Sequence, residues 1–468
     1  MASRDTPARL IDVGSGDSNP RIVMRELLSS KTIKLHYALL SYNWGTRTPM
    51  LLTGSNIDQY QQGMMMDDMP LLYKDAIQLC RRMGLRYLWV AALCIIQDCE
   101  SDWVQEVTEM HKYISAADLV FAASALDCYQ PLLPTAPSPA IAEYRACIQD
   151  EDVDFVSFRL KVRPVLQTAD SVLRENILLR AWRVPEMVLS SKVVLFGQEQ
   201  LYWSCQAGVA AQSSSITTKP LVLSVPGFRK TWSQMSNPQA ASRALHAYWY
   251  QQVEHATKGR VTRHSDRLIS ASAIARSVCE LGKEQYAVGL LRSDMVRGLL
   301  WTDVDGSRKK RDGCCEPSWT WASTIGPASY RLIAGLRKPS VQQEKLAQVS
   351  NLNIQLRTAS SFGQVDGGAL TIAAFSRPGR AMEWTELGTY EYFFDNVADV
   401  GDMSVIAQSI FILLHPWMYN PAGHSRWAGL MIVEISTTPS TYERRGVFIG
   451  PKCEQKLDGW ERQSFVLV

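Results

Sequence analysis

The chain has 468 residues, which is longer than one hydrophobic core usually spans, and this length predicts two or three structural units. Hydrophobic residues make up 46% of the sequence and charged residues 20%, as in soluble globular proteins. The formal net charge is only +3, from 49 basic and 46 acidic residues, and this balance excludes a broad positive field for nucleic acid or an anionic membrane.

The sequence shows no sign of export or of a metal site. Its first residues, MASRDTPARLID, lack an apolar stretch behind a basic cap, and the longest apolar run is about half as long as a membrane-spanning helix. The ten cysteines include no CxxC pair, and no histidines have the spacing of metal ligands. We therefore expect a cytoplasmic protein with buried thiols, no metal and no cofactor.

Strand-like and helix-like patterns alternate in the first part of the chain. An apolar run at 35–45 is followed by a helical pattern at 70–84, between a proline and a glycine. Residues 85–96 are apolar on both alternating faces, as in a strand buried in a parallel sheet. A helix that opens near Asp102, in a capping box, and an apolar strand at 118–125 complete a β-α-β-α-β order. This order predicts a parallel sheet with helices on both faces.

The predicted secondary structure changes twice in the remainder of the chain. Residues 192–205 indicate a two-stranded hairpin, residues 225–300 are helical in pattern, and from about 315 onward short apolar runs alternate with turns. The expected organisation is an N-terminal segment at 1–32, an α/β domain at 33–200, a mainly helical region at 201–310 and a β-rich region at 311–468.

Two short segments are expected to be solvated. VGSGDSNP (13–20) is glycine-rich but lacks the spacing of a dinucleotide or triphosphate loop, so it is expected to form a surface turn. The basic run from Arg308 to Arg311 lies among aspartates, which favours a solvated loop. The alternatives for these basic residues are a nuclear localisation signal and a contact with phosphate.

Four stretches of the sequence resemble the fungal heterokaryon-incompatibility (HET) domain family. They are YALLSYNWG (37–45), AIQLCRRMGLRYLWVAALCIIQD (76–98), RAWRVPEMVLSSKVVLF (180–196) and a set of downstream segments that includes EPSWTWAS and YERRGVFIG. The resemblance places the domain at about 33–190 and implies an α/β fold that is distantly similar to TIR domains.

The chain departs from the family pattern at two positions. Ala91 stands where the family usually has an acid, and Pro185 stands where it usually has glutamine, although Glu186 remains. An acid inside a buried strand is costly unless it is paired or functional. The substitution at 91 therefore removes the group best suited to polar chemistry.

The candidate site lies beyond the carboxyl ends of the expected parallel strands, where open α/β sheets bind ligands. Two such ends carry Tyr42-Asn43-Trp44 and Asp98, and the third family segment is expected nearby. EPSWTWAS is expected to place its two tryptophans on one face of a short strand. The expected catalytic residues are Arg180, Tyr42 and Glu186, and the expected substrate-binding residues are Trp44, Asn43, Asp98, Trp182, Trp319 and Trp321. The alternatives are core anchors for the tryptophans and a buried ion pair for Arg180 and Glu186.

The sequence is compatible with three classes of function. The resemblance implies a cell-death effector of non-self recognition that signals by self-association or breaks down NAD as some TIR-like domains do. HET-like proteins also serve fungal natural-product biosynthesis, including the [4+2] closure of a norbornene in the sordarin-type diterpenoid pathway. A pericyclic reaction needs a shaped apolar cavity and no nucleophile, which suits a chain that has lost polar family residues but keeps its aromatic cleft. On this family context the chain is predicted to be a cofactor-free Diels-Alder cyclase for a small terpenoid-like substrate. A non-catalytic scaffold is the third class, and a homo-oligomer is left open.

Overall fold

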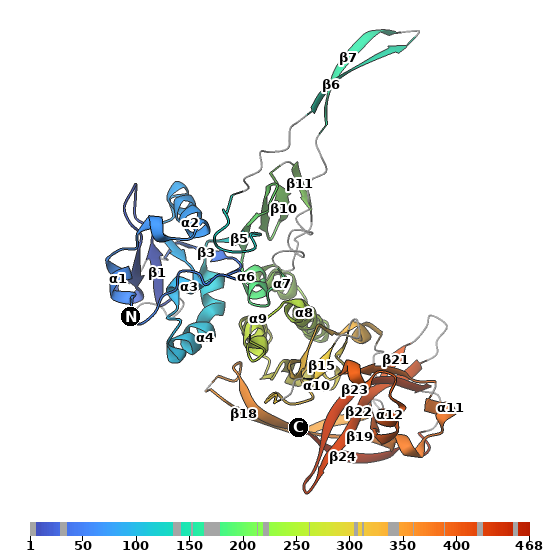
Figure 1. Cartoon of the computed structure of the whole chain (residues 1–468). Helices are drawn as coiled ribbons and strands as arrows, with labels where there is room; N and C mark the ends of the chain where they lie inside the picture. The colour runs from blue at the N-terminus through green and yellow to red at the C-terminus, as the bar shows by residue number, and fades with distance from the viewer. Residues whose placement is uncertain are drawn as a thin grey trace. The chain divides into compact units, whose positions relative to one another are not determined.

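The structure is a computed structural model, and it describes residues 6–28, 35–133, 142–150, 153–162, 178–212, 214–218, 224–261, 263–303, 308–310, 313–335, 346–358, 360–387, 389–418, 425–452 and 457–468. The chain divides into two compact units (Figure 1). The first comprises Met1–Leu179 and Glu186–Phe228, and the second comprises Arg180–Pro185 and Arg229–Val468. No helix among the described residues is long and apolar enough to cross a membrane.

The first unit is built on a nine-stranded mixed sheet in the order β11-β10-β9-β8-β5-β3-β4-β1-β2. The central strands β8, β5, β3 and β4 run parallel, whereas the strands on both flanks pair antiparallel. The predicted parallel sheet is therefore right for its centre and wrong for its edges. The strands are β1 (Arg9–Asp12), β2 (Arg21–Met24), β3 (Tyr37–Ser41), β4 (Tyr87–Trp89), β5 (Leu119–Ala123), β8 (Lys192–Phe196), β9 (Leu201–Cys205), β10 (Gly208–Ala211) and β11 (Ser214–Thr218).

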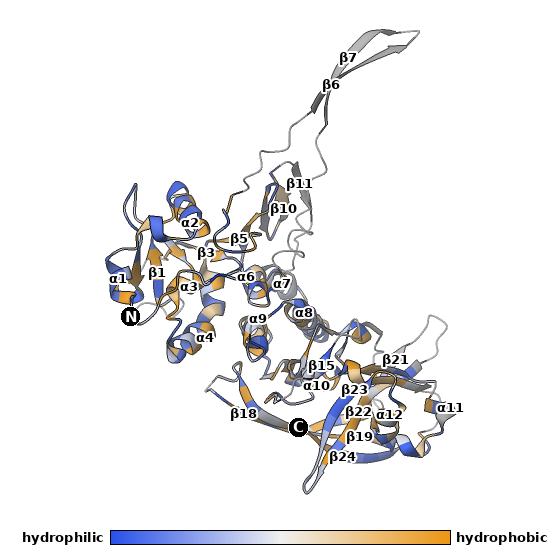
Figure 2. Cartoon of the chain, in the orientation of Figure 1, coloured by the Kyte–Doolittle hydropathy of each residue, from blue (hydrophilic) through white to orange (hydrophobic). Residues whose placement is uncertain are grey.

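Amphipathic helices connect the parallel strands. Helix α2 (Leu71–Arg82) leads from β3 to β4 and α4 (Glu100–Ala116) leads from β4 to β5. Figure 2 shows hydrophilic and hydrophobic residues on both helices, as expected for helices with one buried face. The first unit also contains η1 (Arg25–Leu28), α1 (Ile57–Gln62), η2 (Met66–Asp68), α3 (Ala91–Cys94) and a separate hairpin of β6 (Ala142–Asp150) and β7 (Val153–Val162), while α6 (Arg183–Val188) and α7 (Val225–Ser233) cross the unit boundaries.

Helix α4 does not open with the predicted capping box. Its N-cap is Cys99, without a side-chain cap hydrogen bond. The carboxylate of Asp102 instead accepts two hydrogen bonds from Arg9 Nη2, at 2.6 and 2.5 Å, and one from Ile96 N at 2.8 Å. The helix begins two residues before Asp102, so Asp102 lies in its first turn and pairs with the buried Arg9 of β1.

Residues 85–96 differ from the prediction of one buried strand. Strand β4 ends at Trp89, and after Val90 the chain turns into the single helical turn of α3. Cys94 N donates to Val90 O at 2.8 Å, which closes the turn. A short apolar run fits a buried strand or a buried helical turn equally well, and alanine and leucine favour the helix. Ala91 therefore lies just beyond the strand, not inside it.

The second unit contains helices and a β-rich region, and the sequence pattern predicts the β-rich C-terminal region. Its seven-stranded sheet has the order β18-β19-β21-β22-β23-β20, and β24 pairs with both β19 and β23, so five strands form a closed ring. The helices are α8 (Pro238–Lys258), α9 (Asp266–Gly282), η4 (Arg292–Asp294), α10 (Met295–Gly298), η5 (Trp321–Ser323), η6 (Arg331–Gly335), η8 (Gly379–Ala381), α11 (Trp384–Leu387), η9 (Val397–Asp399) and α12 (Met403–Gln408). The main strands are β18 (Ala347–Leu356), β19 (Val365–Pro378), β20 (Glu391–Phe394), β21 (Ile410–Met418), β22 (Ser425–Thr437), β23 (Ser440–Lys452) and β24 (Glu461–Leu467), and the two-residue strands are β12 (Tyr286–Ala287), β13 (Leu290–Leu291), β14 (Thr302–Asp303), β15 (Lys309–Lys310), β16 (Thr324–Ile325) and β17 (Ala328–Ser329).

The basic run at 308–311, of which Arg311 lies outside the described residues, is not a solvated loop at its first residue. Arg308 is fully buried, and its guanidinium lies 4.6 Å from the ring centroid of Trp301. Its Nη2 donates to Trp321 O at 2.7 Å and to the hydroxyl of Thr324, while its backbone N–H donates to Asp303 at 2.7 Å. The prediction was wrong for this residue because the groups that accept hydrogen bonds from its guanidinium, Trp321 O and the Thr324 hydroxyl, lie outside the basic run, and no local charge pattern reveals them.

Candidate functional site

The carboxyl edge of the parallel strands in the first unit is the candidate site. Strand β4, which follows β3 in the chain, pairs with one side of β3. Strand β5, the next in the chain, pairs with the other side of β3. The strand order therefore reverses between β3 and β5, which is where open α/β sheets hold ligands. The segments that leave these two strands are residues 42–45 and 124–130.

The two segments lie against each other. Asn43 Nδ2 donates to Ala125 O at 3.3 Å, and the Cys128 thiol lies 3.9 Å from Trp44 O. Gly45 has φ +81°, and a Cβ added there would lie 2.2 Å from the Cβ of Asp127, so only glycine fits. Side chains and backbone of the protein therefore occupy the point at which the strand order reverses.

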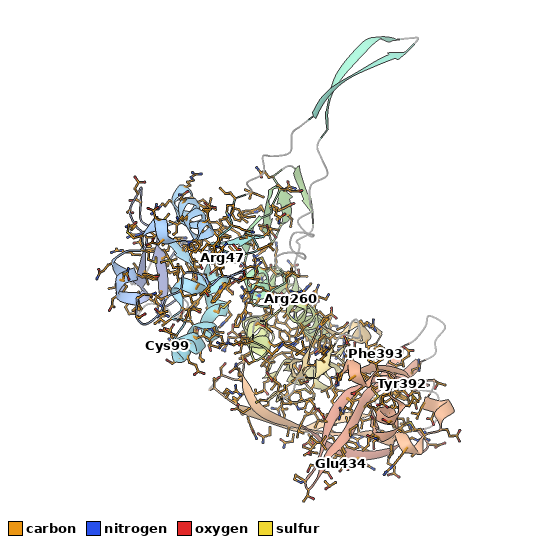
Figure 3. The ribbon with its side chains drawn as sticks, in the orientation of Figure 1. Arg47, Cys99, Arg260, Tyr392, Phe393 and Glu434 are labelled. Carbon is orange, nitrogen blue, oxygen red and sulfur yellow. The ribbon has the colours of Figure 1, made fainter. Side chains whose placement is uncertain are left out.

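An exposed pair extends this contact outward. The Arg47 guanidinium lies 4.5 Å from the ring centroid of Tyr129, whose hydroxyl donates to Thr48 O at 3.0 Å. Figure 3 labels Arg47 in the first unit. The turn that presents Tyr129 is held by Asp127, whose carboxylate accepts from Tyr129 N at 2.9 Å and from Gln130 N at 3.2 Å.

Residues 46–56, called here the edge loop, also reach the other side of β3. Leu52 N donates to Ala92 O at 2.8 Å, and Gln97 N donates to Leu52 O at 2.9 Å. The carboxylate of Asp98 accepts from Gly54 N at 2.9 Å. The edge loop is therefore fixed to α3 on one flank and to the turn after β5 on the other, and Asp98 is one of its anchors.

Tyr42 is a buried member of this edge. Its hydroxyl forms a hydrogen bond with that of Tyr73 on α2, and the two rings meet edge to face with centroids 5.4 Å apart. Burial raises the pKa of Tyr73, and the hydrogen bond from Tyr42 only partly opposes this rise. The pair is thus a neutral hydrogen-bonded contact that fixes α2 to the end of β3.

Ala91 begins α3 at the same edge, and its side chain is half-buried. Gln97 Nε2 donates to the carbonyl oxygens of Ala91 and Ile95 at 3.1 and 2.9 Å. The position at which the family pattern has an acid therefore lies at a partly exposed helix start. The expected burial penalty for an acid inside the strand does not apply here.

The remaining expected residues are divided between the units. Arg180 and Trp182 belong to the second unit, where Ala181 N donates to Arg260 O at 3.0 Å and the Trp182 side chain donates to Asp266. Arg260 is labelled in Figure 3. The first unit contains Tyr42, Asn43, Trp44 and Asp98, and also Glu186, which is buried in α6 on the path into the amino end of β8.

Trp319 and Trp321 are fully buried in the second unit. Trp321 begins the 3-10 helix η5, in which the Thr320 side chain caps Ala322 N, so the predicted strand with both rings on one face is wrong. Trp321 Nε1 donates to Gly289 O at 2.9 Å, and Trp319 O accepts from Trp301 Nε1 at 3.0 Å. Both tryptophans serve as core anchors, and their part in a substrate cavity stays a prediction.

The second unit also contains a cleft of about 470 Å³ above a buried ion pair. Arg444 Nε lies 2.9 Å from Asp395 Oδ2, and its guanidinium lies 3.3 Å from the ring centroid of Trp301. Burial raises the pKa of Asp395 to about 6 although Arg444 and Arg308 act to lower it, and burial lowers the pKa of Arg444 to about 10. Because Arg444 also donates to Leu299 O and Trp301 O at 2.9 and 2.6 Å, this pair holds the floor of the cleft together.

The carboxyl edge offers hydrogen bonding more than acid–base chemistry. It presents the half-buried side chains of Asn43 and Trp44 and the exposed carboxylate of Asp98. Across the part of the chain that the structure describes, no three histidine, cysteine, aspartate or glutamate side chains are placed to hold a metal ion.

Sequence reasoning missed the edge loop and the turn after β5. An aspartate that starts a turn, as Asp127 does, is a recognisable local signal. Its partner Gly45 lies far away in sequence, so the contact between the two became visible only with the sheet order.

Residues 37–186 match the model of a family described as Heterokaryon incompatibility protein (HET). The match begins with β3, contains β4, β5 and the loops of the carboxyl edge, and ends in α6, so it includes the segment Arg180–Pro185 of the second unit. No curated protein and no solved structure matches the chain, and the likeness to TIR domains stays a prediction. Residues 37–186 of this chain are therefore similar to a HET domain.

Proposed function

We propose that the chain acts in heterokaryon incompatibility, as an effector of non-self recognition in fungal cells. The observation that carries this proposal is the position of the HET match. It covers the strands β3, β4 and β5 together with the loops that meet at their carboxyl edge. The family likeness therefore falls on the same residues that the strand order marks as a binding edge.

We further propose that the carboxyl edge acts by binding a partner or a second copy of the chain, and not by breaking down a nucleotide. The half-buried indole of Trp44 and the amide of Asn43 suit recognition, because aromatic rings contribute large contact areas and amides fix orientation. The position of the family acid is alanine in this chain, which removes a carboxylate from the same edge.

The test is expression of the full chain from an inducible promoter in a filamentous fungus, with cell viability as the readout. Wild-type protein is expected to arrest or kill the cells, and Trp44→Ala and Asn43→Ala are expected to abolish this effect. Trp203→Ala is the matched control, since Trp203 lies on β9 of the same unit, is 40% exposed and is outside the HET match. Normal growth of cells that accumulate wild-type protein would overturn the proposed role.

A second measurement separates binding from catalysis. Purified full-length chain is expected to leave NAD intact over hours at micromolar protein concentration. Consumption of NAD that Trp44→Ala abolishes would overturn the binding mode while leaving the role in incompatibility in place.

The cyclase prediction has less support. It requires an apolar cavity that holds both reacting ends of the substrate. Trp319 and Trp321 are instead enclosed by the core of the second unit, and the cleft of that unit has charged groups such as Asp395 and Glu443 in its lining. No observation favours a [4+2] reaction over the effector role, and cyclase activity stays a prediction.

A further inference from the structure

A cleft of the first unit lies at the edge of its sheet opposite to the carboxyl edge. The antiparallel pairing of β1 with β4 places Asp12 beside Tyr87, and Val13 N donates to Arg86 O at 3.0 Å. The end of β1 and the start of β4 therefore meet at the amino edge of the parallel strands. The cleft there has a volume of about 710 Å³, which falls in the range of small-molecule sites.

One arginine shapes the loop that forms a wall of this cleft. Arg81, in the last turn of α2, donates through Nε and Nη2 to Val13 O at 2.8 and 2.6 Å. It also donates to Gly16 O at 2.7 Å and to Ser18 O at 2.6 Å. The guanidinium thus gathers the carbonyl oxygens of the loop on its own side.

The glycines of this loop have left-handed backbone conformations. Gly14 has φ +66° and Gly16 has φ +54°, while Ser15 between them does not have a positive φ. Ser15 N donates to Ser18 Oγ at 2.9 Å, so this backbone N–H is held within the loop itself. Gly14 N donates to the carboxylate of Asp12 at 3.2 Å, so this N–H is directed at an anion.

Two further arginines present their charge to the cleft. Arg86 donates through Nε and Nη2 to the Asp12 carboxylate at 3.3 and 3.0 Å, and Arg21 Nη2 lies 3.8 Å from the same carboxylate. The side chains of Arg86 and Arg21 are 66% and 54% exposed, whereas that of Asp12 is 6% exposed. Both guanidiniums are therefore held at the cleft and remain accessible to a ligand.

The charges in the cleft do not balance. Its lining has three arginines and the single carboxylate of Asp12, so its formal charge is +3 − 1 = +2. Burial acts to raise the pKa of Asp12, but the hydrogen bonds from Arg86 and Gly14 and the nearby positive charges together lower it. Asp12 therefore stays ionised and can neutralise only one of the three guanidiniums.

We propose that this cleft binds the phosphate groups of a small ligand such as a nucleotide. Arg21 and Arg86 contact the phosphate oxygens, and Arg81 is the positioning residue that holds the loop. A guanidinium presents paired N–H donors that match phosphate oxygens, which makes arginine suited to this ligand class. The site is separate from the carboxyl edge, so its existence does not depend on the role in incompatibility.

The test uses the purified full-length chain, inorganic pyrophosphate and ATP as probes, and isothermal titration calorimetry at low and moderate salt. Wild-type protein is expected to bind at least one probe, with an affinity that falls as salt rises. Arg21→Ala and Arg86→Ala are each expected to weaken binding by about tenfold or more, the usual cost of losing a charge-assisted hydrogen bond. Similar affinities for both probes would support recognition of phosphate alone, and tighter binding of ATP would support a nucleotide site.

The control is Arg82→Ala, which makes the same charge change one residue along α2 at an exposed position outside the cleft lining. It is expected to leave both affinities within about twofold. Absence of binding of either probe at low salt, or an equal loss in Arg82→Ala, would overturn the proposal. If Arg86→Ala unfolds because Asp12 loses its hydrogen bonds, Arg21→Ala decides the matter, since the Arg21–Asp12 separation of 3.8 Å is too long for a hydrogen bond.

Discussion

Ala91 and Ala92 are neighbours in α3, yet an acid at the two positions is expected to have very different effects. At the half-buried position 91, aspartate loses at most about 0.7 kcal/mol of helix propensity relative to alanine. A carboxylate in the first turn of a helix gains about 0.3–1 kcal/mol from the backbone dipoles. Ala91→Asp is therefore expected to change the free energy of unfolding by less than about 1 kcal/mol.

Ala92 has an exposed fraction of 0%, so Ala92→Asp would bury a carboxylate without a partner. A loss of about 3 kcal/mol or more is expected for that change. Hydrogen exchange of the full chain, read from peptides that cover residues 85–98 across a urea series, measures the stability of this region directly. Equal destabilisation by the two substitutions would refute the placement of Ala91 at a partly exposed helix start and would favour a buried strand instead. The Ala91→Asp protein, if it folds as expected, also allows NAD consumption and cell killing to be measured with the acid in place.

Three further predictions concern backbone strain and buried charge. Gly45→Ala is expected to lower the free energy of unfolding more than Gly84→Ala does. Both glycines have positive φ, but only the Cβ added at Gly45 would meet a neighbour, Asp127, at 2.2 Å. Equal losses in urea unfolding would contradict the close approach of the two loops. Asp395→Leu is expected to destabilise the second unit by about 3–5 kcal/mol by leaving Arg444 buried and unpaired, and the double variant with Arg444→Met is expected to recover most of that loss in thermal unfolding. The pKa of Asp395 is raised from 3.8 to about 6 on folding, so the folded state holds this proton more tightly than the unfolded state. The contribution of Asp395 to stability is therefore present below pH 4 and is lost as pH rises to about 6. Asp395→Asn is expected to remove this part of the pH dependence of unfolding, and an unchanged slope between pH 4 and 6 would contradict the prediction.

Periodicity in the sequence was sufficient for elements with one clear face. The helical pattern at 70–84 became α2 (Leu71–Arg82), the apolar run at 118–125 became β5 (Leu119–Ala123), and the hairpin at 192–205 became β8 and β9. It was insufficient at residues 85–96, because an apolar run that is buried on all sides carries no period to separate strand from helical turn. The burial of Arg308 was also not predictable, since its guanidinium donates to Trp321 O and the Thr324 hydroxyl, which lie outside the basic run.

The candidate site was predictable to the extent that it depends on strand ends. Tyr42, Asn43 and Trp44 do follow β3 at the carboxyl edge, as parallel strands require. The contact of Asn43 with Ala125 and the anchoring of Gly54 by Asp98 depend on which strands are neighbours in the sheet, and the sequence does not state that order.

The location of Ala91 decides whether stability can explain why this residue is alanine and not an acid. If this residue lay inside a buried strand, alanine could be explained by stability alone, because an acid there would cost several kcal/mol. At the half-buried start of α3 an acid would cost little, so folding gives no reason for its absence. The alanine therefore bears on what the carboxyl edge does. An edge that presents Trp44 and Asn43, and that has alanine where the family pattern has an acid, retains the groups that we propose to recognise a partner.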